Sequence, residues 1–371
     1  MFKFVTVLAA VVAMASAEMT FEDYVKKFNK GYKVDSSEWR EHASIFAQEI
    51  QKVRVHNERP NATYKRGINK FSDMTTKERG AFFGFNKNAG TKGHQNRLHA
   101  GADHHKSVSD LPASVDWRDA GIVTPVKDQG HCGSCWAFAA TAVLESHVAK
   151  ESGLLFSLSP QQISSCSPNP EHCGGTGGCE GATAEIGFDY AASSSGLYQE
   201  FQYPYNSYYG DDAACMDYAS PVAAIDGYVK LAETNYTALM NAVATFGPIA
   251  VSVDASDWSS YEGGIFDGCN DVQPDINHAV TLVGYGECEV HGKYWLIRNS
   301  WSPAWGESGY MKLRRDDGDE ANCAMDTTPQ DGSACAGDDA PVKVCGSCGV
   351  LYDTSYPTGA HAFATDEERH P

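Results

Sequence analysis

The chain has 371 residues, of which 42% are hydrophobic, so it is long enough to bury a sizeable core and to form two or three compact units. Its formal net charge is −19 and its pI is about 5.0, with no stripe of basic residues. Nucleic acid and anionic membrane surfaces are therefore not expected as partners, because both would repel the protein.

Residues 1–17 have the pattern of a secretory signal peptide. A positively charged start is followed by an apolar run at residues 4–14 and a small-residue cleavage site at residues 15–17. The run is too short for a membrane-spanning anchor. We therefore expect entry into the secretory pathway, with the lysosome, the vacuole or the extracellular space as destination. The sequons at Asn61 and Asn235 are predicted glycosylation sites on that route.

The front of the chain, residues 18–110, contains no cysteine. Its first part, to about Asn57, carries aromatic and apolar side chains at helical intervals, which predicts a helical region. A polar motif, Gly67-Ile-Asn69-Lys-Phe71-Ser-Asp73, follows it. Residues 86–110 are rich in Gly, Asn, His and Ser and predict an exposed linker of the kind that proteases cut.

The stretch 129–138, QGHCGSCWAF, places a cysteine at the predicted start of a helix. Apolar residues recur at helical spacing over 137–148. A helix that opens at Cys135 puts the sulfur at the positive end of the helix dipole, which favours the thiolate. Gly133 allows a substrate backbone to come close. The amide of Gln129 is a candidate donor to a developing oxyanion.

Two later segments extend this pattern: NHAVTLVGYG contains His278, and YWLIRNSW contains Asn299. Together with Cys132-Gly-Ser-Cys135-Trp136 they resemble the active-site signature of papain-family cysteine proteases, in which roughly 130–150 residues separate the cysteine from the histidine. Taken singly, His278 also fits a core residue at a strand end, and Asn299 a turn former. Three matched segments in the right order favour catalysis.

The resemblance implies a nucleophilic mechanism for peptide hydrolysis. Cys135 would attack as a thiolate, His278 would pair with it and protonate the leaving amine, and Asn299 would orient the imidazole. Gln129 and the Cys135 backbone N–H would bind the oxyanion. Trp301 would shield the bond between His278 and Asn299 from water. No metal and no organic cofactor are implied.

The resemblance also implies where a substrate lies. Gly133 and Gly181 would line the cleft, and Asp353 would form the base of the pocket for the second residue before the cut. The other walls of that pocket would be Thr183, Ser252, Val253 and Ile276. A carboxylate at the base predicts that Arg is accepted beside apolar residues, while a surface position for Asp353 is the alternative.

The front segment resembles the inhibitory propeptide of the same family. The Gly67–Asp73 motif carries the resemblance, and the helical region departs from the usual pattern at His42 and Glu49. We therefore expect a zymogen whose mature enzyme begins near Leu111, with the propeptide as its own inhibitor. Residues 111–371 would form an α+β papain-like peptidase of two halves, helix-rich over 111–220 and strand-rich and β-barrel-like over 221–371.

All twelve cysteines lie at or after Cys132, which predicts a disulfide-stapled body. By position in the family pattern, the implied bonds are Cys132–Cys179, Cys166–Cys215 and Cys269–Cys348. The pairing of five others stays open: Cys173, Cys288, Cys323, Cys335 and Cys345. Two alternative uses are a redox pair at Cys132 and Cys135 and a zinc site near Cys345 and Cys348. The acidic stretch 316–340, an insertion relative to the family, is expected to be a surface loop.

The leading interpretation is a monomeric endopeptidase that acts on proteins and peptides and is open to cystatin-like inhibitors. A catalytically silent binding protein on the same scaffold is the alternative. Ser302-Pro303-Ala304 stands where the family usually has a glycine and small residues, which keeps that alternative open. Ala182 also replaces a usual glycine, with a modest expected effect. A third class, a free inhibitory propeptide, would need separate expression.

Overall fold

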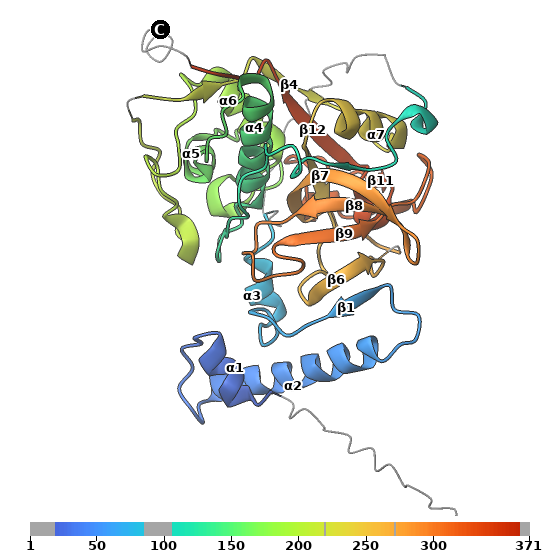
Figure 1. Ribbon diagram of the computed structural model, residues 1–371. Helices are drawn as coiled ribbons and strands as arrows, with labels where there is room; N and C mark the ends of the chain where they lie inside the picture. The colour runs from blue at the N-terminus through green and yellow to red at the C-terminus, as the bar shows by residue number, and fades with distance from the viewer. Residues whose placement is uncertain (1–18, 85–105, 219, 271, 364–371) are drawn as a thin grey trace, which may run out of the picture.

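The computed structural model describes residues 19–84, 106–218, 220–270 and 272–363. The signal segment 1–17 and most of the linker 86–110 lie outside the described residues. Figure 1 shows the front of the chain (blue) as a helical domain below a larger body. In that body, most helices gather on one side and most strands on the other.

The predicted front helix is two helices, α1 (Phe21–Lys27) and α2 (Ser37–Asn57). Ser36 separates them, because its extended backbone and its side chain cap the N-terminus of α2. Aromatic rings pack the pair together, and the centroids of Tyr24 and Phe46 lie 4.4 Å apart. The front domain therefore has its own small core.

Two further elements connect this domain to the body. Strand β1 (Tyr64–Arg66) pairs antiparallel with β6 (Tyr261–Phe266) and extends the sheet of the body by one strand. Helix α3 (Thr76–Gly80) follows, with Thr75 and Glu78 forming a capping box at its start. As Figure 1 shows, α3 leads the chain up toward α4.

Helix α4 (Cys135–Ser152) forms the centre of the body. Every residue from Cys135 to Ala149 is buried, as expected for a helix that is apolar on all sides. Gly153, at φ 73°, ends it in the left-handed conformation. It packs against α5 (Pro160–Cys166) and α6 (Ala184–Ser193) on one side and against the sheet on the other.

The strand-rich half is one sheet in the order β1-β6-β9-β8-β7-β5-β12-β4, with β2 beside β7. All neighbours are antiparallel except β6 and β9. Its remaining strands are β2 (Val115–Asp116), β4 (Gly227–Lys230), β5 (Ile249–Val253), β7 (His278–Cys288), β8 (Gly292–Arg298), β9 (Tyr310–Arg314) and β12 (Asp353–Thr358). The α+β class is confirmed. The described strands do not close into a barrel, however, because β1 and β4 end the order without meeting.

A few smaller elements complete the described fold. Helix α7 (Tyr236–Thr245), which we did not predict, packs against β7. A small pair is formed by β3 (Ala223–Ala224) and β13 (His361–Ala362). Single 3-10 turns occur at Val108–Asp110, Gly178–Glu180, Ser207–Tyr209, Pro329–Asp331 and Ser347–Gly349.

The acidic insertion is not a simple surface loop. Strands β10 (Ala324–Asp326) and β11 (Val342–Val344) pair at its base, where Cys323 is bonded to Cys345. Residues 327–341 between them, which we call the bridging loop, extend to the helix-rich half. The insertion therefore connects the two halves of the body.

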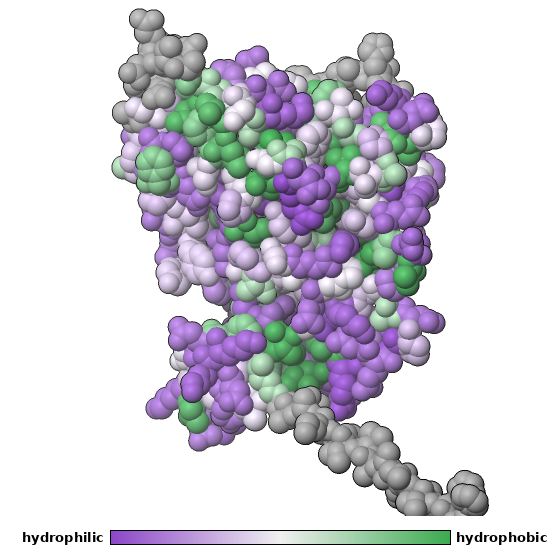
Figure 2. Space-filling model, viewed as in Figure 1, coloured by the Kyte–Doolittle hydropathy of each residue, from purple (hydrophilic) through white to green (hydrophobic). Residues whose placement is uncertain are grey.

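The surface agrees with the acidic composition. Figure 2 shows hydrophilic residues over most of the visible face, with apolar residues in small separate groups. Within the part of the chain that the structure describes, no helix is long and apolar enough to cross a membrane.

Candidate active site

Cys135 is the first residue of α4, and its side chain is fully buried. The unpaired N–H groups and the positive dipole end of the helix therefore surround its sulfur. From the other half, the backbone N–H of Ala279 in β7 donates to Sγ at 3.3 Å. This contact places the thiol at the junction of the helix-rich and strand-rich halves.

His278 opens β7 beside this sulfur, since it directly precedes Ala279. Its Nε2 lies 2.9 Å from Oδ1 of Asn299, which also accepts a hydrogen bond from the backbone N–H of Ser300 at 2.8 Å. The Asn299 oxygen therefore requires a proton on Nε2, and Nδ1 of the neutral ring is then a base. Nδ1 is buried and has no hydrogen-bond partner among the described residues. The Trp301 ring covers the imidazole, with centroids 4.8 Å apart.

Gln129 is fully buried, and its amide is held at both ends. Its Oε1 accepts a hydrogen bond from the Ser300 hydroxyl at 2.6 Å. Its Nε2 donates to the carbonyl of Cys132 at 2.9 Å and to that of Phe82 at 3.1 Å. Because Phe82 belongs to the front segment, the Gln129 amide already holds a backbone carbonyl of the chain that fills the cleft.

The front segment runs directly over the candidate nucleophile. A side chain at Gly84 would meet the Cys135 sulfur at 2.2 Å, so only glycine fits there. Gly133 and Gly181 line the same passage, and a Cβ on either would meet backbone oxygens of residues 83 and 84 at 2.9 and 2.0 Å. These two predicted cleft residues therefore let a peptide backbone lie against the site.

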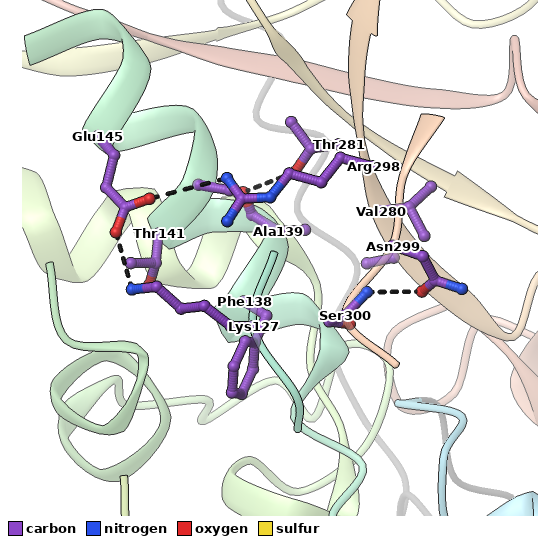
Figure 3. Close-up of a pocket in the computed structure, with 12 residues that line it drawn as sticks. Lys127, Phe138, Ala139, Thr141, Glu145, Val280, Thr281, Arg298, Asn299 and Ser300 are labelled. Atoms are coloured by element: carbon purple, nitrogen blue, oxygen red, sulfur yellow. Dashed lines mark hydrogen bonds and ion pairs between the residues drawn. The ribbon is translucent and has the colours of Figure 1, made fainter. Parts of the chain in front are cut away.

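Behind the site, a buried carboxylate links the two halves (Figure 3). Glu145 on α4 accepts from Lys127 Nζ at 2.8 Å and lies 3.8 Å from the Arg298 guanidinium at the end of β8. Asn299 follows Arg298 directly, so this cluster fixes the backbone that carries it. The cavity among these residues measures about 10 Å³, hardly the volume of one water, and is an interior gap.

Comparison with known proteins shows which family this chain belongs to. Residues 111–331 match the model of the papain family cysteine protease, and residues 21–78 match that of the cathepsin propeptide inhibitor domain (I29). The chain belongs to the papain family of cysteine proteases. It is a cysteine endopeptidase made as a zymogen, with a propeptide that inhibits it.

Full-length relatives have the same plan. The chain is 38% identical over 323 residues to a cathepsin L-like proteinase of Phaedon cochleariae. This match covers 85% of this chain and 94% of the relative. It is 33% identical to the cysteine endopeptidase Rep1 of Oryza sativa subsp. japonica, over 95% and 91% of the two chains. The structure of digestive procathepsin L 3 of the Tenebrio molitor larval midgut matches with a TM-score of 0.68 and 32% identity. The match covers 91% of this chain and 97% of that chain.

In the proenzyme, burial favours the neutral forms of the candidate pair. Burial raises the pKa of the Cys135 thiol to about 12, against the hydrogen bonds that its sulfur receives from backbone groups of Ala279, Gly84 and Trp136. Burial also lowers the pKa of His278 to about 4, against its bond to Asn299. The thiolate that we expected from the helix dipole is thus not favoured in the proenzyme, because the cleft is closed to water.

Asp73, the last residue of the propeptide motif, is a buried anchor. Its carboxylate accepts from the hydroxyls of Tyr24 and Tyr32, each at 2.9 Å, and pairs with Lys30 Nζ at 2.7 Å. Its backbone oxygen contacts Nδ1 of His42 at 2.8 Å, so the departure at His42 is accommodated by a hydrogen bond. The motif therefore joins both propeptide helices.

The same motif holds the propeptide to the body. Asn69 Nδ2 donates to the Ser259 carbonyl at 2.7 Å, and Lys70 Nζ pairs with Asp128 at 3.0 Å. Phe71 packs on Trp301, with ring centroids 5.2 Å apart.

Five disulfides occur among the described residues. Three join the pairs that the family resemblance implied: Cys132–Cys179, Cys166–Cys215 and Cys269–Cys348. The other two are Cys173–Cys335 and Cys323–Cys345, while Cys135 and Cys288 are free. The redox-pair and zinc alternatives are therefore wrong, because the cysteines they need are bonded elsewhere. No group of three or more candidate metal ligands occurs in the described ranges.

The predicted specificity residues are only partly together. Thr183 and Asp353 line one cavity of about 300 Å³, and the Ser252 hydroxyl donates to Asp353 at 2.6 Å. Val253 and Ile276 are fully buried and are not among the residues that line this cavity. Asp353 is itself buried, so the alternative of a surface position is wrong.

The altered loop after Trp301 keeps its place. Ser302 takes φ 79°, a left-handed conformation that explains why a glycine is usual there. Its N–H still bonds to the Lys127 carbonyl at 3.2 Å, and Trp301 stays on His278. The replacement of the usual glycine by Ser302 therefore strains the backbone locally and leaves the rest of the loop in place.

Sequence reasoning missed three residues that the structure brings to the site. Ser300 holds Gln129, and its place beside Asn299 was the only available signal. Glu185 and Lys230 line the cavity at Asp353, and nothing in their local sequence marks them. Of the sequons, Asn61 is exposed, whereas Asn235 is half-buried and its Oδ1 caps α7.

Proposed function

We propose that this protease cleaves peptide bonds with Cys135 as nucleophile and His278 as its acid–base partner. Once the propeptide leaves, the Cys135 proton passes to Nδ1 of His278, and the thiolate attacks the scissile carbonyl. The imidazolium then protonates the leaving amine, and water hydrolyses the thioester. Asn299 holds the ring in place through Nε2 in every step.

The observation that carries this proposal is the state of the His278 ring. Its Nε2 lies 2.9 Å from Oδ1 of Asn299, while its buried Nδ1 has no hydrogen-bond partner among the described residues. The Cys135 sulfur accepts a hydrogen bond from the N–H of Ala279, the residue that follows His278. A buried ring nitrogen without a partner is uncommon in native proteins, and a role as proton acceptor accounts for it here.

Gln129 supports the same assignment. Its Nε2 binds the propeptide carbonyl of Phe82, and the backbone N–H of Cys135 lies at the open end of the helix. In a substrate complex these two donors are suited to stabilise the oxyanion. Gly133 and Gly181 would then receive the substrate backbone where residues 83 and 84 now lie.

The finer features of the function follow from the resemblance and the sequence. We propose that the cavity at Asp353 accepts apolar residues and Arg at the second position before the cut. The signal segment 1–17 supports export to the lysosome, vacuole or extracellular space, with glycans at Asn61 and Asn235. We further propose that the mature enzyme acts as a monomer and is bound by cystatin-like inhibitors.

The test is acid activation of the purified proenzyme. The wild type should trim itself near Leu111 at acid pH and then cleave peptides with Leu or Arg at the second position. A Cys135→Ala proenzyme should do neither, yet it should be trimmed when active wild type is added. If the Cys135→Ala protein trims itself or cleaves the peptides, the assignment of the nucleophile is wrong.

A further inference from the structure

The cavity at Asp353 is more acidic than the sequence alone predicted. Its wall contains six carboxylates and one lysine among its described lining residues. The acidic side chains are Glu171, Glu185, Asp189, Glu233, Asp338 and Asp353, and the lysine is Lys230. Its volume of about 300 Å³ lies at the small end of the range for ligand sites and suits one long side chain.

The bridging loop builds one wall of this cavity. Cys335 in the loop is bonded to Cys173 in the helix-rich half. On either side of that bond, the Gly174 N–H donates to the Ala334 carbonyl and the Ala336 N–H to the Glu171 carbonyl, both at 3.0 Å. The wall is thus joined to both halves of the body.

Inside the cavity, Asp353 already has a cationic partner. Lys230 Nζ lies 2.6 Å from its Oδ1, and the Ser252 hydroxyl donates to its Oδ2 at 2.6 Å. Burial opposes ionisation of Asp353, but Lys230 and these hydrogen bonds hold the pKa of its carboxyl below the usual value. Burial lowers the pKa of Lys230, yet Asp353 and Glu185 outweigh it and keep the ammonium charged.

Glu185 is the second buried carboxylate of this wall, and it shares the charge of Lys230 with Asp353. It lies in the first turn of α6, four residues after Gly181 of the cleft, and only 8% of its surface is exposed. Its Oε2 is buried without a hydrogen-bond partner, although the side chain lines the cavity. Burial and the charge of Asp353 raise its pKa, and the charge of Lys230 offsets part of that rise.

We propose that Glu185 is the specificity-determining residue of this pocket, and that its carboxylate binds the basic side chain of the second substrate residue while Lys230 holds Asp353. A guanidinium or ammonium group from the substrate supplies a second cation and the missing hydrogen-bond donor together. A Leu side chain fills the space but leaves Oε2 unpaired. The inference rests on the proposed function, because it concerns the substrate of the same site.

The experiment compares two peptides that differ only in Arg or Leu at the second position before the cut. The readout is the ratio of their kcat/KM values for the activated enzyme. Glu185→Gln keeps the size of the side chain and removes its charge, so we expect the Arg/Leu ratio of kcat/KM to fall at least about 10-fold. Lys230→Gln should raise the Arg/Leu ratio, because the carboxylate of Asp353 then loses its ion-pair partner and is free to bind the substrate Arg.

Glu289→Gln, an exposed position on the β7–β8 hairpin, is the matched control and should leave the ratio unchanged. If Glu185→Gln keeps the ratio of the wild type, or lowers cleavage of both peptides equally, the inference is wrong. Failure of the proposed function would look different, since the wild type would then cleave neither peptide.

Discussion

At the scale of single residues, Gln129 shows how a side chain is prepared before any substrate binds. Ser300 fixes its amide oxygen, so its N–H groups must point toward the Cys132 carbonyl and the cleft. A donor that is already oriented needs no rearrangement when charge develops in the transition state. The propeptide uses this same donor through Phe82.

We predict that Gln129→Ala lowers kcat of the activated enzyme about 10²–10³-fold with little change in KM, because the lost hydrogen bond matters most in the transition state. Steady-state kinetics on a Leu-containing peptide measures this effect. Ser300→Ala is the matched comparison and should have a smaller effect, since it loosens the amide without removing it. A loss of less than about 10-fold for Gln129→Ala would speak against an oxyanion role.

At the scale of elements, several contacts hold the propeptide on the body, and the buried Asp73 connects them to the propeptide helices. Strand β1 is bound to the sheet edge, Asn69 and Lys70 bind the body, and Asp73 ties both propeptide helices to this motif. Residues 82–84, which cross the cleft, follow this motif after the short helix α3. Loosening Asp73 should therefore weaken the inhibitory contact from a distance.

We predict that Asp73→Asn speeds acid autoactivation about 10-fold or more. The substitution leaves Lys30, of which 13% of the side chain is exposed, without its charged partner, and breaking such a buried pair destabilises by about 3 kcal/mol. The rate of propeptide loss, followed on gels at one fixed pH, measures the effect. Asp35→Asn, at an exposed site in the same domain, should activate like the wild type, and equal rates for both variants would contradict the prediction.

At the scale of the whole molecule, the fold buries neutral histidines in both halves. Burial lowers the pKa of His278 and that of His147 on α4 to about 4 each. The unfolded chain binds protons at these histidines below about pH 6.5, whereas the folded chain binds them only near pH 4. Unfolding therefore takes up protons in this window, and stability falls as the pH drops from about 6.5 to about 4.

We predict that the melting temperature of the Cys135→Ala proenzyme falls through that window. Each of the two histidines contributes up to about 3 kcal/mol of this loss. His147→Gln should flatten the dependence, because glutamine can still donate to the Pro248 carbonyl that His147 Nε2 contacts at 2.9 Å but does not titrate. Calorimetry between pH 7 and pH 4 measures both proteins. An unchanged slope would show that His147 is not a source of the acid sensitivity.

Local patterns were enough for much of the fold and for the candidate catalytic residues. Helix α4 begins at the cysteine as its apolar spacing predicts, and the motif Gly67–Asp73 lies where a propeptide anchor should. The front helix was predicted without its break, since Ser36 was not recognised as a cap. Helix α7 was missed because the glycine-separated apolar runs around it predict strands.

The sequence by itself determined what depends on residues close together in the chain or on motifs in a fixed order: the family, the zymogen plan and the identity of Cys135, His278 and Asn299 as candidates. Only the tertiary structure decided what depends on contacts between distant segments. The propeptide covers the cleft, and burial raises the pKa of the Cys135 thiol. Lys230 from β4 pairs with Asp353 from β12, and Glu185 from α6 keeps a buried oxygen without a hydrogen-bond partner among the described residues. Desolvation and ion pairing are set by whichever groups meet in space, and the order of residues along the chain does not specify them.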